Sequence, residues 1–109
     1  MLVALAGLPG TGKSHLAARL AAALGGVVIS KDVVRAALFP GPALDYSAEQ
    51  DDVAMRAVFA AAAHVRRTQP TRPVFLDGRT YSKARQVADL LALGVELGER
   101  VRVIECVCP

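Results

Sequence analysis

The chain has 109 residues, of which 53% are hydrophobic and 21% charged, so it has enough apolar material for one packed domain and is not a disordered segment. The net charge of +3 suits a protein that handles phosphate, but it is too small and too scattered to indicate a DNA-binding surface. Aromatic residues make up only 5% of the chain, so the core must consist mainly of Ala, Val and Leu.

Neither a membrane span nor an export signal is predicted. The longest apolar stretch, residues 53–65, is too short to cross a bilayer and contains Arg56 and His64. The first residues carry no basic segment and lead directly into a glycine-rich loop, unlike a signal peptide. Cys106 and Cys108 are too close together for a disulfide framework, so we expect reduced thiols and a cytoplasmic protein. A C-x-C metal or redox site is the alternative.

In chain order, short apolar runs alternate with helical patterns. Leu2–Ala6 is a continuously apolar run that predicts a buried parallel strand. Leucines at four-residue spacing predict a helix over Lys13–Leu24, which a glycine pair ends. Val27–Ser30 predicts a second strand, and Asp32–Phe39 predicts a short helix closed by prolines.

A longer helix follows. Ser47 and Gln50 form a capping-box pattern, so the helix should begin at Ser47 and run to Arg67. We expect its inner face to carry residues at helical spacing, namely Val53, Ala57, Ala60 or Ala61, and His64 or Val65. His64 on this face is expected to be packed or half-buried.

The last third of the chain predicts two more strands around one helix. Val74–Leu76 is an apolar strand that ends at Asp77, and Val101–Val107 is the fourth strand. Between them, a helix over Ser82–Leu93, extending to Leu97 if Gly94 is tolerated, should turn its apolar side chains inward, namely Val87, Leu90 and Leu91. The alternation predicts an α/β fold, a single domain over residues 1–109 with a parallel four-stranded sheet in a three-layer αβα arrangement.

The loop after the first strand carries the clearest motif. Residues 7–14, Gly7-Leu8-Pro9-Gly10-Thr11-Gly12-Lys13-Ser14, match G-x-x-x-x-G-K-[ST] in full. Glycines allow the backbone N–H groups to point into one concavity, and the following helix adds its positive N-terminal end. We therefore expect ATP to bind here, with Lys13 at the β- and γ-phosphates and the Ser14 hydroxyl on Mg²⁺.

Two acidic residues at strand ends complete the expected site. Asp77 ends an apolar strand as a metal-orienting acid would, acting on Mg²⁺ through water; a simple turn residue is the alternative. Asp32 follows the second strand and should lie near the γ-phosphate, where a carboxylate accepts a proton from an attacking hydroxyl. Arg35, one turn further on, could hold an anionic part of the substrate. The alternative is that Asp32 caps its helix and Arg35 is a solvated charge.

The segments GLPGTGKS, SKDVVR and VFLDGRTYS resemble the small P-loop kinases, the AAA-domain group of predicted kinases related to polynucleotide kinase, zeta toxin, chloramphenicol phosphotransferase, gluconate kinase and adenylyl-sulfate kinase. The resemblance covers essentially the whole chain. It implies a sheet ordered 2-3-1-4, Asp32 as general base and Arg35 as a substrate anchor.

The sequence departs from that group at three places. His15 follows Ser14 where many relatives have Thr, and it either touches the α-phosphate or is an ordinary first-turn residue. Arg79 follows Asp77-Gly78 and could contact substrate or phosphate, or be a solvated loop charge. Relatives continue past the fourth strand into an arginine-bearing lid and a fifth strand, so we expect the domain to be incomplete at its carboxyl end.

These features predict an ATP-dependent phosphotransferase whose catalytic residues are Lys13, Asp32 and Arg35. The acceptor would be a hydroxyl of a small molecule or of a nucleic-acid end, with a sugar, an antibiotic and adenylyl sulfate all open; nucleic acid would be a partner only as such an end. An ATP-binding or ATP-hydrolysing switch or accessory module without a small acceptor is the alternative, and a non-functional remnant is a third reading.

Overall fold

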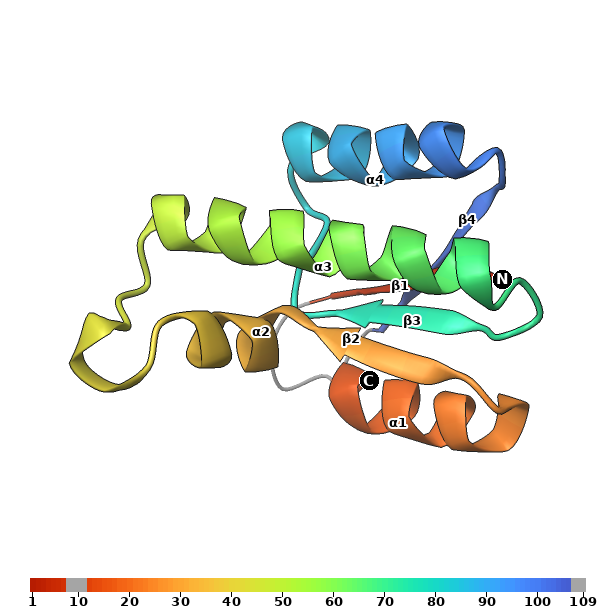
Figure 1. Ribbon diagram of the computed structural model, residues 1–109, viewed down its shortest axis with the longest axis horizontal. Coiled ribbons are helices and arrows are strands. Elements are labelled where there is room, and N and C mark those ends of the chain that lie inside the picture. Colours follow the sequence, from red (N-terminus) through yellow and green to blue (C-terminus); the bar gives the residue numbers. More distant parts are fainter. Residues whose placement is uncertain (8–11, 107–109) are drawn as a thin grey trace.

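The computed structural model describes residues 1–7 and 12–106, which form a parallel four-stranded sheet between two layers of helices (Figure 1). The strands are β1 (Leu2–Ala6), β2 (Val27–Ser30), β3 (Val74–Asp77) and β4 (Val101–Glu105). Their order is β2-β3-β1-β4, and each adjacent pair is parallel. The predicted fold class and strand order are therefore confirmed.

Helices occupy both faces of this sheet, as Figure 1 shows: α1 covers one face, and α3 and α4 lie over the other. Their bounds are α1 (Lys13–Leu24), α2 (Lys31–Leu38), α3 (Ala48–Thr68) and α4 (Ala84–Leu97), with a short 3-10 turn η1 (Gly41–Ala43) after α2. Each predicted helix is present, and α4 continues through Gly94 to Leu97. Among the described residues, no helix is long and apolar enough to cross a membrane.

The core has two halves because successive side chains of a strand point to opposite faces. Leu2 and Ala4 of β1 pack with α3 and α4, whereas Val3 and Leu5 pack with α1. Both halves are built mainly from aliphatic side chains; Phe75 of β3 is the largest fully buried side chain, and it lies on the α1 side. The small-residue core expected from composition is present.

The inner face of α3 differs from the prediction by about one residue. Its buried side chains are those of Ala54, Met55, Val58, Ala62 and Ala63. Ala60, Ala61 and His64 are exposed, so the expected packing of His64 is wrong. Alanine fills so many positions of this helix that the apolar periodicity does not distinguish neighbouring faces. Packing against side chains of β1 and β3 determines which face of α3 is buried.

The inward face of α4 also differs in part from the prediction. Leu90 and Leu93 are buried, whereas Leu91 is 59% exposed and Val87 is 39% exposed. Leu90 and Leu93 are three residues apart and lie on one side of the helix, while Leu91 lies about 100° away. The strand β4 ends at Glu105; Cys106 has a free, half-buried thiol, and the predicted strand residue Val107 and the Cys108 thiol lie outside the described residues.

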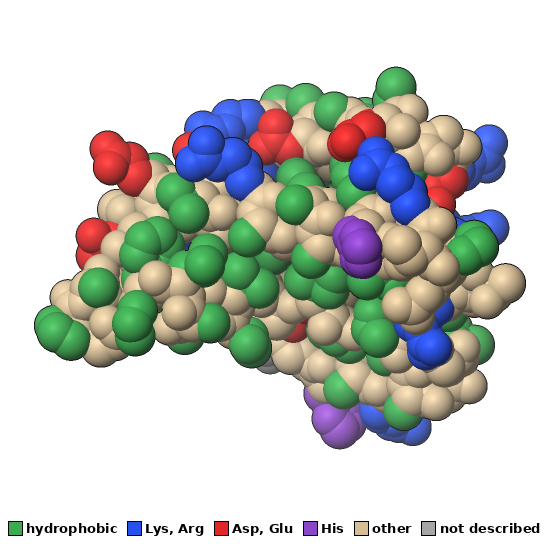
Figure 2. All heavy atoms as spheres, viewed as in Figure 1, with side chains coloured by type: hydrophobic (Ala, Val, Ile, Leu, Met, Phe, Trp, Pro, Cys, Tyr) green, Lys and Arg blue, Asp and Glu red, His purple; other side chains and the backbone are tan. Residues whose placement is uncertain are grey.

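Charged side chains are unevenly distributed over the surface. Figure 2 shows most of the Lys, Arg, Asp and Glu side chains of this face in its upper part, over α3 and α4, while apolar side chains are exposed over its left and middle parts. Arg66 and Arg67, at the end of α3, pair with Glu99 and Glu96 respectively. These ion pairs join α3 to the carboxyl-terminal end of α4.

Candidate functional site

The site lies where the carboxyl ends of β1, β2 and β3 meet the starts of α1 and α2. A cavity of about 600 Å³ opens there, and the predicted residues that line it are Gly12, Lys13, Ser14, His15, Asp32 and Asp77. Leu8, Pro9, Gly10 and Thr11, the middle of the predicted phosphate loop, lie outside the described residues.

The two ends of the phosphate loop have glycines for steric reasons. Gly7 has a φ of +128°, and a Cβ there would lie 2.4 Å from the carbonyl oxygen of Cys106. Gly12, the N-cap residue of α1, has a left-handed φ of +82° with nothing within 4 Å of a Cβ position. At Gly7, a side chain would collide with the Cys106 carbonyl, just after β4. At Gly12 there is space for a side chain, but the positive φ disfavours any residue other than glycine.

The ammonium group of Lys13 is held at the base of this loop. Lys13 is only 8% exposed, and its Nζ donates to the carbonyl oxygens of Gly7 at 2.8 Å and Arg79 at 3.2 Å. An ammonium has three N–H donors, so these contacts use two of them. The remaining donor and the positive N-terminal end of α1 make this edge of the sheet suited to an anion.

Ser14 and Asp77 are in direct contact across the sheet edge. The Ser14 hydroxyl donates to Asp77 Oδ2 at 2.6 Å, while Asp77 Oδ1 is buried without a hydrogen-bond partner among the described residues. A hydroxyl and a carboxylate with an unsatisfied oxygen are ligands that Mg²⁺ accepts. No group of three or more His, Cys, Asp or Glu residues gathers in the described part of the chain, so such an ion would also need oxygens from water or a bound phosphate.

Asp32 lies in the first turn of α2 with its side chain exposed to the cavity. Ser30 is the N-cap residue of α2, and its hydroxyl accepts from the Val33 N–H at 3.5 Å. The alternative that Asp32 caps this helix is therefore wrong. His15 is likewise exposed beside Ser14, on the same cavity.

Arg35 does not line the cavity of Asp32. It is 6% exposed, donates to the carbonyl oxygen of Ser47 at 2.9 Å, and lies 5.6 Å from the centroid of the Tyr46 ring. It borders a second cavity of about 330 Å³, which shares Arg79 and Gln86 with the first. Arg35 is thus not the solvated charge of the alternative reading, and the three-residue spacing from Asp32 did not place the two side chains together.

Several residues at the site were not singled out from the sequence. Lys31, Gly78, Thr80 and Gln86 also line the first cavity. Lys31 adjoins Asp32 and Gly78 adjoins Asp77, so adjacency to a predicted acid is the signal that could have identified them. A Cβ at Gly78 would lie 2.6 Å from Lys31 Cβ, which shows how closely the ends of β2 and β3 approach.

Asp51 of α3 lies next to these cavities and forms ion pairs with three cationic side chains. It accepts from Lys31 Nζ at 2.5 Å and from Arg79 at 3.4 Å, and Arg35 lies 3.8 Å away. Burial alone would raise the pKa of Asp51, but the hydrogen bond and charge of Lys31 and the charge of Arg79 outweigh it and hold this pKa below its ordinary value. Asp51 is therefore ionised at neutral pH and joins α2, α3 and the loop after β3.

Comparison with known proteins identifies the family and the fold of the chain. A family model described as an AAA domain matches residues 2–109. A search of curated proteins gave no match. Among solved structures, the chain is similar to an inferred kinase of Chloroflexus aurantiacus, with 22% identity, a TM-score of 0.80, and coverage of 97% of this chain and 57% of that one.

Two further structures share the fold. A chain of the Pnkp1/Rnl/Hen1 complex has 22% identity and a TM-score of 0.79, with coverage of 99% of this chain and 35% of that one. The APS kinase CysC of Mycobacterium tuberculosis, solved with AMPPNP and APS, has 21% identity and a TM-score of 0.73, with coverage of 99% and 62%. The present chain thus spans between about a third and two thirds of the length of these structures. Because the family model spans nearly every residue, and the fold is that of P-loop kinases, the protein belongs to this AAA-domain family.

Proposed function

We propose that this protein binds ATP with Mg²⁺ and transfers the γ-phosphate to a hydroxyl group of a small molecule or of a nucleic-acid end. The observation that carries the proposal is the convergence of Lys13, the Ser14–Asp77 pair and Asp32 on one cavity. The similar APS kinase was solved with AMPPNP and APS, a nucleotide and an acceptor, which supports the assignment of the cavity to a triphosphate.

Each residue then has a specific task. Lys13 and the phosphate loop, from Gly7 to Ser14, bind the β- and γ-phosphates, and His15 lies at the α-phosphate. Ser14 and Asp77 would hold Mg²⁺, which neutralises charge on the β- and γ-phosphate oxygens when bound. The hydrogen bond between them holds the Ser14 hydroxyl and the Asp77 carboxylate side by side in the absence of the ion.

The chemical step is an in-line displacement. The acceptor hydroxyl oxygen forms a bond to the γ-phosphorus while the bond from that phosphorus to the β–γ bridging oxygen breaks, and ADP leaves. The proton of the hydroxyl passes to the Asp32 carboxylate. Asp32 suits this task because its side chain is exposed to the cavity and its carboxylate makes no hydrogen bond to another described residue.

The acceptor would occupy the second cavity. Three cationic side chains, Arg35, Lys83 and Arg85, border it with the two carboxylates of Asp51 and Asp52, and the buried Arg79, paired with Asp51 and Asp89, forms part of its wall. This excess of positive charge favours an acceptor that carries an anionic group. The guanidinium of Arg35 is already bound to the Ser47 carbonyl and lies over the Tyr46 ring. We therefore infer that Arg35 helps to hold the acceptor by forming part of the cavity wall.

The test is the response of ATP binding and transfer to Lys13→Ala. We expect the dissociation constant for Mg·ATP to rise roughly 10- to 100-fold, the value of a lost charge-assisted hydrogen bond. Arg19→Ala is the matched control, since it removes one positive charge from an exposed position of the same helix. Equal ATP affinity in the two variants would remove the proposal, and phosphate transfer to a panel of anionic and neutral hydroxyl compounds would identify the acceptor.

A switch or accessory module without an acceptor remains the second candidate. It is favoured by one observation, that Arg35 lies apart from Asp32 and is committed to Ser47. Such a module needs Lys13, Ser14 and Asp77 but not Asp32. Turnover that survives Asp32→Asn unchanged would identify it.

A further inference from the structure

Two consecutive carbonyl groups of the loop between β3 and α4 bind the first residue of the phosphate loop and the ammonium group of Lys13. The Thr80 carbonyl oxygen accepts from the Gly7 N–H at 3.2 Å, and the Arg79 carbonyl oxygen accepts from Lys13 Nζ at 3.2 Å. Gly7 is the residue after β1, and Lys13 is the first residue of α1. A shift of residues 79–80 would therefore disturb the Gly7 main chain and the Lys13 ammonium.

This loop has an unfavourable backbone. Gly78 has a φ of +114°, and Tyr81 has a φ of +54°, the single positive φ of a non-glycine residue among the described residues. A left-handed conformation is unfavourable for a non-glycine residue, because its Cβ comes too close to the following carbonyl oxygen. The loop keeps this conformation because other contacts outweigh that cost.

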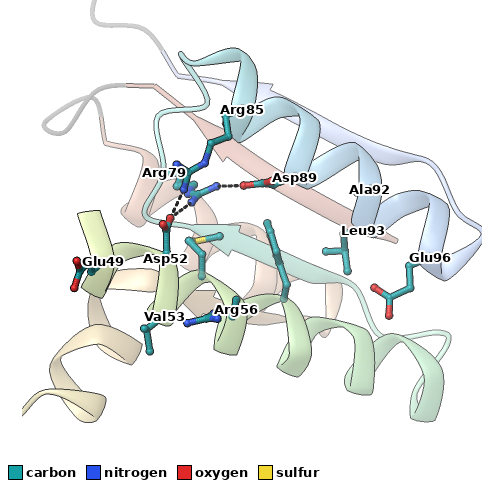
Figure 3. Close-up of a pocket in the computed structure, with 12 residues that line it drawn as sticks. Glu49, Asp52, Val53, Arg56, Arg79, Arg85, Asp89, Ala92, Leu93 and Glu96 are labelled. Atoms are coloured by element: carbon teal, nitrogen blue, oxygen red, sulfur yellow. Dashed lines mark hydrogen bonds and ion pairs between the residues drawn. The ribbon is translucent and has the colours of Figure 1, made fainter. Parts of the chain in front are cut away.

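The Arg79 side chain provides such contacts. It is only 3% exposed; its Nη1 donates to Asp89 Oδ2 of α4 at 3.2 Å and its Nη2 to Asp51 Oδ2 of α3 at 3.4 Å. Figure 3 shows the guanidinium between Asp52 and Asp89, with Arg85 beside it. A planar guanidinium can bridge carboxylates on two helices, which a lysine ammonium does less well. The side chain is thus fixed to both helices that cover this face of the sheet.

The main chain of Arg79 faces the other way, toward the phosphate site. Its carbonyl oxygen and that of Gly7 take two of the three donors of the Lys13 ammonium, which directs the third toward the cavity. The position of that donor depends on where the Arg79 carbonyl lies, and this depends on the ion pairs of the Arg79 side chain.

We propose that Arg79 is a positioning residue for Lys13: its ion pairs to Asp51 and Asp89 fix the loop carbonyls that aim the lysine at the terminal phosphates of ATP. The inference rests on the proposed ATP site. It assigns Arg79 no contact with substrate or phosphate, in contrast to the role considered from the sequence.

The experiment compares the affinities of ATP and AMP, because AMP lacks the β- and γ-phosphates that Lys13 contacts. For Arg79→Met we expect the dissociation constant of Mg·ATP to rise about tenfold and that of AMP to change less than about twofold. Arg79→Lys should recover part of the ATP affinity, since it restores one charge but not the bridge. An equal loss for ATP and AMP would indicate a general structural role and overturn the proposal, as would an unchanged ATP affinity.

The matched control is Arg66→Met. Arg66 is another arginine with a largely buried side chain, 8% exposed against 2% for Arg79; it is bound to Glu99 and to the Arg72 carbonyl, and it does not line either cavity of the site. The Arg66→Met substitution should lower the melting temperature without changing the affinity for ATP. If Arg79→Met does not fold, Asp89→Ala decides: it removes the α4 ion pair at a part-exposed position, and we expect an ATP-specific loss of about threefold. No such loss would overturn the proposal.

Failure of this inference can be told apart from failure of the proposed function. If the unaltered protein binds no Mg·ATP, or Lys13→Ala binds it equally well, the ATP site itself is wrong and the role of Arg79 is overturned with it. If Lys13→Ala loses affinity while both Arg79→Met and Asp89→Ala retain it, only the positioning role is wrong.

Discussion

The Ser14 hydroxyl donates a 2.6 Å hydrogen bond to Asp77 Oδ2, joining two residues 63 positions apart in the chain. The parallel pairing of β1 with β3 brings them together. Asp77 is the last residue of β3, and Ser14 lies in the helix that follows β1, so both are at the same edge of the sheet. The second carboxylate oxygen of Asp77 is buried without a partner among the described residues. A bound cation would satisfy it.

Metal dependence of nucleotide binding should follow from this pair. In Ser14→Ala, the affinity for ATP should fall about tenfold in the presence of Mg²⁺ and stay unchanged in excess EDTA, because only the metal-bound form uses the hydroxyl. Calorimetric titration in the two buffers measures the difference, and each variant serves as its own control. Asp77→Asn should show the same pattern, and an equal loss in both buffers would contradict a metal role.

Loss of the proposed base should affect turnover without affecting binding. Asp32→Asn removes the proton acceptor but keeps the shape of an exposed side chain, so kcat should fall roughly 100-fold or more with the affinity for ATP unchanged. Steady-state transfer assays and a binding titration give the two values. Glu49→Gln, an exposed acid in the first turn of α3, is the control and should leave both unchanged.

A side chain at the start of the phosphate loop should be far more damaging than one at the end of α1. Gly7→Ala would place a Cβ 2.4 Å from a backbone oxygen, whereas Gly25→Ala meets nothing within 4 Å. Both positions have a positive φ, so the comparison separates the clash from the backbone cost of about 1 kcal/mol. We expect Gly25→Ala to lower the melting temperature by a few degrees and Gly7→Ala to prevent stable folding. Similar melting curves for the two variants would show that the Cys106 carbonyl does not lie close enough to Gly7 to exclude a side chain.

Stability in acid should depend on Asp51. Its folded-state pKa lies below the unfolded value, so its contribution is fully present above the unfolded pKa, about 3.9, and is lost as the pH falls through the folded pKa. Asp51→Asn should therefore lower the free energy of unfolding at neutral pH and flatten its decline below about pH 4. Urea denaturation at a series of pH values measures both effects, and parallel pH profiles for the two proteins would contradict this role of Asp51.

Two adjacent leucines of α4 provide a test of the helix face. Leu90→Ala removes a side chain that is 1% exposed and should cost about 2–5 kcal/mol, whereas Leu91→Ala affects one that is 59% exposed and should cost less than about 0.5 kcal/mol. Chemical denaturation of the two variants measures the difference. The reverse order would mean that α4 packs through the other face.

Local patterns of residues were sufficient to predict the helices, the strands and the phosphate-loop motif. Apolar runs marked β1, β2 and β3, because strands of a parallel sheet that is covered on both faces admit few polar side chains, whereas β4 includes Arg102 and Glu105. The spacing of glycines, lysine and serine marked the phosphate loop, because close backbone approach and a positive φ exclude most other residues there. The acids at the ends of β2 and β3 followed from the same rule that strand ends line the ligand edge.

Which side chains are in contact could be read only from the folded chain. The Ala-rich α3 has no face that local periodicity singles out, so packing against the sheet selected Ala54 and Val58 over Ala57 and Ala61. The grouping of Arg79 with Asp51 and Asp89 joins residues 28 and 10 positions apart, and the separation of Arg35 from Asp32 depends on a hydrogen bond to Ser47. Such contacts between distant parts of the chain leave no spacing in the sequence, because they depend on how α2, α3 and α4 lie over the sheet.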